Sequence, residues 1–570
     1  LSSKYPIHRR KLAENYKKAF LLKEKMLVQI QRQNKTLERI VKKQDLRVLI
    51  TYPNYSMMLT PSYAVGLFTS ILKQQGYNVD LFDCTQYMAS YEASGIPNSE
   101  TLSKKLMAGL PFDALALFGA PKTDLLGDFA RHLDDFKPHA VVFSTVVEDT
   151  WPQTRDLLKV LSHHPEIKSI VGGIYTTMAP ADVIADSYVQ CIGEGEGEHT
   201  VVDFCEAVRH GISPINIPGT RAKDGNGQVI LNSPRSLVDI NETPIADFSL
   251  FDKRRFTRPL GAKIWNAIPM ETFRGCPYTC TFCNSPPQVD IAKKKGQGDF
   301  KRRKSMPTLQ KEITTLLEQN NGNFLYINDD SFMARPKKEI AEFAQMYKDI
   351  RIPFWFQTRL EDIDEEHLAM LKEVGAYRIS FGLEHGNEQF RREKLLRHIS
   401  NERMVEKSKI VAKVGIPYSV NVIIGLPYET RDLVFDTIRL NRELEGFDSV
   451  APNIFTPYHG TVLRDMAIKE GWLDPNLQTR SFVGGSLLNM PPPYLQVSEM
   501  LALQSTYNFY VNLPKSRWPD IERLEKAIEH AERTRIPNEE IEVLSKKLKD
   551  EFYLTKYGTT EAERMLTYAG

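Results

Sequence analysis

The sequence has no long apolar run and almost no net charge. No stretch of about 18 apolar residues, the length of a membrane-spanning helix, occurs in the chain of 570 residues. The 74 basic and 72 acidic side chains leave a formal net charge of +2, so the charge gives no indication of a nucleic-acid partner. The first residues also lack the apolar core of a secretion signal. We therefore expect a cytoplasmic protein without a transmembrane segment.

Cysteine is scarce, and its six copies are unevenly spread. Three of them fall within eight residues, as Cys276-x3-Cys280-x2-Cys283. The other three stand alone, a pattern unlike the paired cysteines of a secreted disulfide scaffold. The clustered cysteines therefore indicate a cofactor site rather than disulfide bridges.

Short apolar strands alternate with helices over residues 46–210, after a charged helical extension over residues 1–45. This alternation predicts a parallel doubly wound, Rossmann-like sheet, which binds ligands at the carboxyl ends of its strands. Residues 211–262 are expected to form a hairpin around Asp224–Gly227 and a linker. The expected strands are Arg47–Thr51, Asn78–Phe82, Ala114–Phe118, Ala140–Ser144, Ser169–Val171 and Tyr188–Ile192.

A second alternation of strands and helices covers residues 263–461. Six βα units predict a partial, TIM-like (β/α)6 barrel with its chemistry at the strand C-termini. Residues 462–570 are expected to form a helical domain, so the fold class is α/β with a helical C-terminal addition. The expected barrel strands are Ile268–Phe273, Phe324–Asn328, Phe354–Gln357, Arg378–Gly382, Ser419–Ile424 and Ser449–Phe455.

The cysteine triplet follows the first expected barrel strand, on a loop that contains Gly275 and Pro277. Thiolates are soft ligands that suit iron–sulfur clusters or zinc. Structural zinc normally takes four protein ligands, and no fourth Cys or His lies at zinc-finger spacing. A cubane cluster held by three cysteines keeps one iron open to an external ligand. We therefore expect the triplet to hold a catalytic 4Fe–4S cluster.

The segment resembles the radical SAM superfamily, whose CxxxCxxC signature has an aromatic residue before the third cysteine, here Phe282. Further resemblances are Tyr326–Phe332, Gly382–Gly386, and NVIIGLPYET from Asn421, which has Tyr428 where glycine is usual. The resemblance implies that the open iron binds S-adenosylmethionine (SAM) and that one electron releases a 5′-deoxyadenosyl radical. The implied SAM contacts are Phe282, Asp329, Asp330, Arg359, Glu384 and Asn421.

Several of these residues could instead have a purely structural role. Arg359 and Glu384 could form a structural ion pair at the barrel mouth. Asp329 and Asp330 could cap the turn that follows them. His385 is expected to be a rim residue rather than a catalytic base.

Radical SAM barrels that follow a doubly wound domain often belong to the cobalamin-binding subgroup, and residues 46–210 resemble that domain. Residues 44–80 contain no histidine, so a histidine ligand to cobalt is not expected there. As alternatives, the Gly193–Glu196 segment could be a solvated turn, and Ser144-Thr145 a helix cap. The implied cobalamin contacts are Tyr52, Pro53, Asn54, Ser144, Thr145, Gly172, Gly173, Thr176, Gly193 and Glu194.

The resemblance implies a cobalamin-dependent radical SAM methyltransferase that moves a methyl group from methylcobalamin to an unactivated carbon after hydrogen abstraction. A cyclase or ring-rearranging enzyme with the same cofactors, or a non-catalytic cofactor-binding protein, remains as an alternative. A methylthiotransferase would need a second cysteine cluster, which Cys84, Cys191 and Cys205 do not form. A low-potential electron donor such as ferredoxin or flavodoxin is implied. The substrate, whether small molecule, lipid or peptide, stays open.

Overall fold

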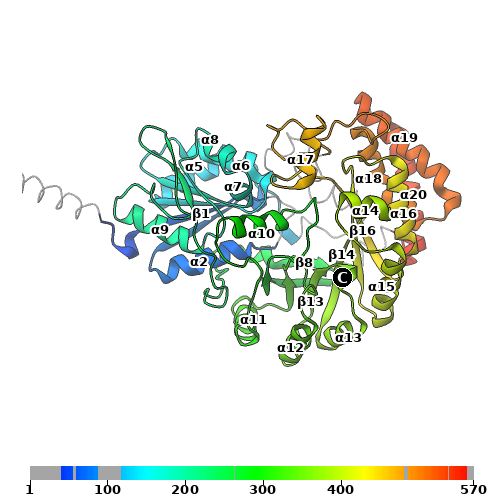
Figure 1. Ribbon diagram of the computed structural model, residues 1–570, viewed down its shortest axis with the longest axis horizontal. Coiled ribbons are helices and arrows are strands. Elements are labelled where there is room, and N and C mark those ends of the chain that lie inside the picture. Colours follow the sequence, from blue (N-terminus) through cyan, green and yellow to red (C-terminus); the bar gives the residue numbers. More distant parts are fainter. Residues whose placement is uncertain are drawn as a thin grey trace, which may run out of the picture.

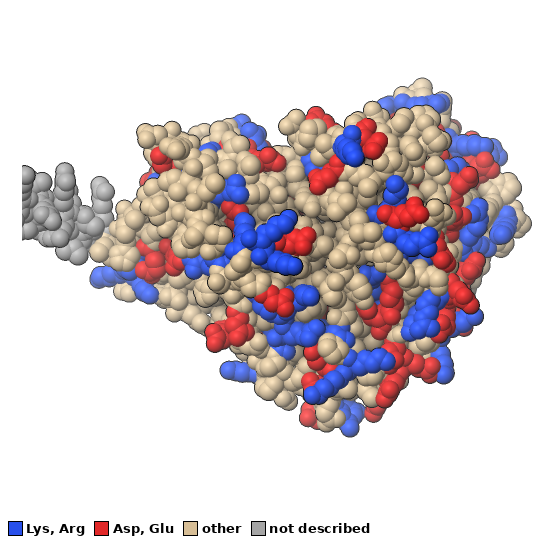
Figure 2. Space-filling view, viewed as in Figure 1, with Lys and Arg blue, Asp and Glu red and all other residues tan. Residues whose placement is uncertain are grey.

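The computed structural model describes residues 40–54, 60–87, 117–261, 263–479, 485–536 and 538–560. Two α/β units lie side by side, and a helical C-terminal segment packs against the second (Figure 1). The expected helix over residues 1–45 falls almost wholly outside the described residues. Acidic and basic side chains are intermixed over the visible face (Figure 2).

The first unit is built on a seven-stranded sheet of order β2-β1-β3-β4-β5-β6-β7. The first five strands in the chain are parallel, and the hairpin β6–β7 adds two antiparallel strands beside β5. Every residue of β3 is buried, because helices cover both faces of the sheet. The strands are β1 (Arg47–Tyr52), β2 (Asn78–Asp83), β3 (Ala140–Thr145), β4 (Lys168–Gly173), β5 (Cys191–Gly193), β6 (Thr220–Lys223) and β7 (Val229–Leu231).

The helices of this unit pack in pairs. One pair comprises α2 (Tyr63–Gln74) and α9 (Glu198–Arg209), and another comprises α5 (Leu125–Phe136) and α6 (Trp151–Leu161). The expected strand Ala114–Phe118 is wrong at its end, because residues 117 and 118 are helical. Its first three residues lie outside the described residues. A short apolar run suits a buried helix as well as a strand, so periodicity alone could not decide.

The second unit has a curled sheet of order β16-β15-β14-β13-β12-β9-β8. Its six parallel strands confirm the predicted partial barrel. The sequence did not predict the seventh, β8, which pairs antiparallel with β9 at the edge of the sheet. The strands are β8 (Thr257–Leu260), β9 (Lys263–Met270), β12 (Phe324–Ile327), β13 (Phe354–Thr358), β14 (Ala376–Glu384), β15 (Tyr418–Ile424) and β16 (Phe447–Ile454).

Helices cover the outer face of this sheet, and local signals delimit them. For example, α15 begins after Ser400, whose hydroxyl accepts the N–H of Arg403, and it ends at Gly415 in the left-handed region. The covering helices are α11 (Met306–Asn320), α12 (Lys337–Tyr347), α13 (Glu365–Val374), α15 (Asn401–Val414) and α16 (Arg431–Glu443).

The burial pattern of the barrel strands alternates strictly in β15. Tyr418 and alternate residues after it are buried in the core beneath the helices. Ser419, Asn421 and Ile423 point to the other, concave face and are only half-buried. The concave face of the sheet therefore remains partly open.

The C-terminal segment is helical, as expected. Helix α18 packs on β16 and α16, and so covers one edge of the curled sheet. Among the described residues, no helix is both long and apolar enough to cross a membrane. The helices are α17 (Val462–Lys469), α18 (Val497–Asn512), α19 (Trp518–Thr534) and α20 (Glu539–Tyr557).

Candidate active site between the two sheets

The three clustered cysteines lie on the loop that leaves β9 at the carboxyl edge of the second sheet. Gly275 opens the loop at φ +93°, and a Cβ there would lie 2.9 Å from the ring of Phe300. Thr281 fixes the middle of the loop, because its N–H donates to Leu395 O and its carbonyl accepts from Leu463 N–H. All three cysteines are half-buried.

The chemistry of this donor set fits an iron–sulfur cluster. Tetrahedral zinc would hold its sulfurs roughly 3.8 Å apart. Among the described residues, the three cysteine sulfurs do not form a set lying wholly within 4.8 Å of one another. Burial raises the pKa of Cys276 to about 11 and that of Cys283 to about 12. Coordination to iron would offset this cost, because a metal stabilises the thiolate.

A cavity of about 650 Å³ lies between this loop and the strand ends of the first sheet. Residues that directly follow the cysteine loop, Asn284 and Gln288, line it together with Asp330 and Tyr458. On the other side, four predicted cobalamin contacts line it: Ser144, Gly172, Gly173 and Gly193. The cavity therefore joins the carboxyl edges of both sheets.

The two adjacent glycines of β4 fit a bulky cofactor. Gly173 has φ +131°, and a Cβ there would lie 1.7 Å from the carbonyl oxygen of Thr145. A Cβ on Gly172 would have no neighbour closer than 3.9 Å, so its backbone faces open space in the cavity. Glycine thus lets a ligand approach the main chain at the end of β4.

Two domain families match this arrangement. Residues 270–440 match the Radical SAM superfamily, and residues 114–204 match the B12 binding domain. The chain is therefore a radical SAM enzyme that carries a B12 binding domain. The predicted cofactors, a 4Fe–4S cluster, SAM and cobalamin, agree with these two domains.

Relatives of this radical SAM enzyme point the same way. An uncharacterized methyltransferase of Pyrococcus horikoshii is 25% identical over 368 residues, which cover 63% of this chain and 76% of that protein. Cytidylyl-2-hydroxyethylphosphonate methyltransferase of Streptomyces wedmorensis is 21% identical over 496 residues, which cover 80% and 86%. The prediction of a radical SAM methyltransferase is thereby confirmed at this coarse level.

One solved structure shares the fold over most of the chain. It is the cobalamin-dependent S-adenosylmethionine radical enzyme OxsB with aqua-cobalamin and S-adenosylmethionine bound. It is 14% identical, covers 92% of this chain and 79% of that one, and has a TM-score of 0.57. The likeness confirms the predicted fold class.

Two of the predicted SAM contacts of the enzyme join a chain of charges behind the cluster loop. Arg359 lies 3.7 Å from Cys280 Sγ, stacks on the ring of Tyr278, and pairs with Glu361. Arg397 pairs with Glu361 at 3.0 Å and lies 3.5 Å from Glu384. Arg359 and Glu384 therefore pair with different partners and not with each other. Burial raises the pKa of Glu384 to about 7.

The adjacent residues Asp329 and Asp330 lie in different surroundings. The carboxylate of Asp329 accepts the N–H groups of Thr272 and Phe273 and pairs with Arg335 at 2.7 Å. Asp329 therefore braces the exit of β9, and it is buried away from the cavity lining, contrary to its predicted role as a SAM contact. Asp330 accepts a hydrogen bond from Ser285 Oγ at 2.8 Å and is exposed to the cavity.

The other barrel residues singled out in the sequence also lie in different surroundings. Asn421 lies on the concave face, where its Nδ2 donates to Ser380 Oγ at 2.9 Å. Phe282 packs half-buried against the main core. The expectation that His385 is a rim residue is wrong, because it is fully buried, stacks on Phe390 and lies 3.2 Å from Glu429.

Six predicted cobalamin contacts are not among the cavity lining. Thr176 Oγ1 lies 2.6 Å from the carbonyl oxygen of Gly193 and 2.9 Å from that of Gly173, and so its hydroxyl braces both strand ends. Thr145 Oγ1 lies 3.2 Å from Thr154 Oγ1 within the unit, not at a helix N-cap. The six residues are Tyr52, Pro53, Asn54, Thr145, Thr176 and Glu194.

The segment Gly193–Glu196 is not a solvated turn, and it leads into Glu198 at the start of α9. Glu194 pairs with Arg221 and with Lys295, which lies just after α10 (Ser285–Lys294). Glu196 pairs with Arg274 at 2.7 Å and with Arg302, and Glu198 pairs with Arg274 at 2.9 Å. Glutamates of the first unit thus hold the residue that precedes Gly275 and the cysteine loop.

The sequence analysis missed Arg274, Glu198 and Lys295. Glu196 and Arg274 are 78 residues apart, and no local pattern links them. The one local signal was the position of Arg274, two residues before Cys276.

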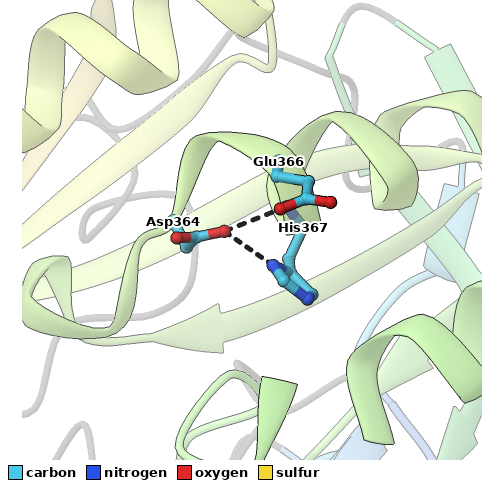
Figure 3. Close-up of side chains that lie close together, drawn as sticks. All are labelled: Asp364, Glu366 and His367. Carbon is cyan, nitrogen blue, oxygen red and sulfur yellow. Dashed lines mark hydrogen bonds and ion pairs between the residues drawn. The ribbon is translucent and has the colours of Figure 1, made fainter. Parts of the chain in front are cut away.

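A further group of polar side chains lies at the start of α13 (Figure 3). Asp364 caps the helix, because it accepts the N–H of His367 and lies 2.6 Å from its Nδ1. Its other carboxylate oxygen is 2.6 Å from Lys337 Nζ. Asp364 and His367 therefore form a helix cap, and Glu366 is an exposed acidic residue in the first turn of the same helix.

Proposed function

We propose that this enzyme transfers a methyl group to an unactivated carbon of its substrate. One cavity reaches from the cysteine loop to the glycine-rich strand ends of the B12-binding domain, and this cavity is the main support for the proposal. When bound, the cluster and SAM would supply a 5′-deoxyadenosyl radical, and cobalamin would supply the methyl group. A carbon between them would be within reach of both.

The residues of the chain have separate tasks in this proposal. Cys276, Cys280 and Cys283 would hold the cluster, and Asp330 would accept a hydrogen bond from the amino group of SAM. Gly172 and Gly173 would let the corrin approach the end of β4. The packing between the two units would keep bulk water away from a radical, which reacts with competing donors when exposed.

An electron must reach the cluster from outside, and we propose a ferredoxin or flavodoxin as the donor. The proposal follows from the radical chemistry of the domain, because release of the 5′-deoxyadenosyl radical consumes one electron. The chain has no second cysteine cluster that could hold a relay, since its other three cysteines lie apart in sequence.

The test is an anaerobic assay of the reconstituted enzyme with a reduced flavodoxin, cell metabolites and SAM that carries a deuterated methyl group. We expect 5′-deoxyadenosine together with a product that carries the label at carbon. Formation of 5′-deoxyadenosine and a changed product without label would replace methyl transfer by cyclisation or rearrangement. Absence of 5′-deoxyadenosine would reject the radical proposal, with Cys280→Ser as the matched inactive control.

A further inference from the structure

The concave face of the barrel sheet carries a second, separate cluster of aromatic residues. Ala267, Phe324 and Trp355 are buried there, and Trp265, Tyr326 and Tyr377 pack against them half-buried. These residues come from neighbouring strands on the face opposite the covering helices. The open barrel therefore has an aromatic floor.

One arginine lies on top of this floor. Arg258 belongs to the edge strand β8, and its side chain reaches across β9 to Tyr326 on β12. Its guanidinium carbon lies 4.6 Å from the centre of the Tyr326 ring, and Nη2 donates to the hydroxyl at 3.1 Å. Trp355 stacks in parallel on the same ring at 4.1 Å, so arginine and tryptophan occupy opposite faces.

Arg258 has no carboxylate within ion-pair distance among the described residues, and it is half-buried. Its remaining polar contact is Thr60 Oγ1, at 3.5 Å. By contrast, Arg378 of the same sheet pairs with Asp448, and Arg335 pairs with Asp329. A guanidinium carries five N–H donors, and a half-buried cation favours an anionic partner.

We propose that Arg258 binds an anionic group of the substrate, a carboxylate or a phosphonate or phosphate, inside the barrel. The aromatic floor around Trp355 and Tyr326 then packs against the apolar part of the same molecule. Arginine suits this task because its planar fork matches two oxygens of such a group. The identity of the ligand as substrate rests on the proposed function, whereas anion binding itself does not.

The experiment uses the anaerobically reconstituted holoenzyme and two probes, phenylphosphonate and benzoate, in isothermal titration calorimetry. At least one probe is expected to bind, and the pair distinguishes a phosphonate site from a carboxylate site. Arg258→Gln is expected to weaken that binding about tenfold or more, and Arg258→Lys to weaken it less. Lys263→Gln is the matched control, because it removes an exposed positive charge from the same hairpin.

Three results would overturn the inference: no binding of either probe to the wild type, equal affinity in Arg258→Gln, or an equal loss in Lys263→Gln. Arg258→Lys keeps the charge, and the cobalamin content of each variant reports whether it is folded. Cleavage of SAM by each variant is measured separately. Loss of anion binding with intact SAM cleavage concerns Arg258 alone, whereas absent SAM cleavage in the wild type concerns the proposed function.

Discussion

The backbone N–H of His459 donates to Oε2 of Glu148 at 3.0 Å, and this bond connects the two units. Glu148 follows β3 of the first sheet, and His459 follows β16, the last strand of the barrel. Oε1 of the same carboxylate contacts His459 Nδ1 and accepts the N–H of Thr479 at 3.3 Å. Glu148 is 1% exposed, so one buried carboxylate serves three donors at the domain border.

Glu148→Ala should lower the free energy of unfolding by about 3 kcal/mol, because it leaves buried donors without an acceptor. Denaturant unfolding measures the change. Glu166→Ala is the matched control, since Glu166 lies 3.7 Å from His164 but is 71% exposed. That variant should change stability by less than about 0.5 kcal/mol. Similar losses in the two variants would contradict a special role of Glu148.

Cys280→Ser should abolish binding of the cluster, because three thiolates are the protein ligands we assign to it. Iron and sulfide analysis after anaerobic reconstitution should show loss of most of the iron, while cobalamin still binds. Cys191→Ser is the control, since Cys191 is buried in the first unit, away from the cysteine loop. An iron content equal to that of the wild type in Cys280→Ser would refute the assignment.

The two glycines of β4 should respond differently to alanine. Gly173→Ala should lower the melting temperature of the first unit, because its Cβ would overlap Thr145 O. The free energy of unfolding should fall by about 2 kcal/mol or more. Gly172→Ala should keep the melting temperature but weaken cobalamin binding, since its Cβ would project into the cavity. Thermal unfolding and cobalamin titration test the pair, and identical behaviour would be inconsistent with the proposed contact.

Tyr428 holds a left-handed backbone, at φ +70°, where the family pattern has glycine. Its ring packs on Trp472 at 4.7 Å and lies under Lys394. Tyr428→Gly and Tyr428→Ala both lose these contacts, but only glycine relieves the backbone. Tyr428→Gly should therefore be about 1 kcal/mol more stable than Tyr428→Ala.

At Tyr494, which does not have positive φ, the order of the same two substitutions should be reversed. Chemical unfolding of the four variants decides the matter. If alanine is more stable than glycine at both positions, the left-handed conformation of Tyr428 carries no strain.

Stability should depend on pH through Asp149. Burial raises the pKa of this carboxyl to about 7, so the folded state binds the proton more tightly than the unfolded state does. The resulting stabilisation is present below the ordinary aspartate pKa of about 4 and is lost as the pH rises through about 7. The free energy of unfolding of the wild type should thus fall relative to Asp149→Asn across this window. A constant difference between the two proteins would exclude the raised pKa.

The alternation of apolar strands with helices was enough to predict the parallel strands of the barrel sheet and most of those of the first sheet, because these strands are largely buried beneath helices. The cysteine triplet was equally accessible, since its three ligands lie on one loop. Strand β8 escaped prediction because its residues alternate weakly and all four are half-buried. An edge strand with no fully buried face gives little hydrophobic signal.

The side chains of the site were harder to predict than the strands that carry them. Asp329 and Asp330 are adjacent and chemically identical, yet one pairs with Arg335 and the other faces the cavity. Consecutive residues at a strand exit point to opposite sides, and only the three-dimensional register shows which side is which. Glu148 and His459 are 311 residues apart, so their contact has no signature in the sequence.

The ion pairs of Glu196 and Glu198 with Arg274 also limit how domains of this enzyme can be recombined with those of other enzymes. Arg274 belongs to the barrel, but two of its three carboxylate partners come from the B12-binding domain. A chimaera that joins this barrel to a foreign cobalamin domain would leave the guanidinium of Arg274, two residues before Cys276, without two of its carboxylate partners. When substrate-binding parts are exchanged between enzymes, the B12-binding domain and the barrel should therefore be taken from the same parent protein.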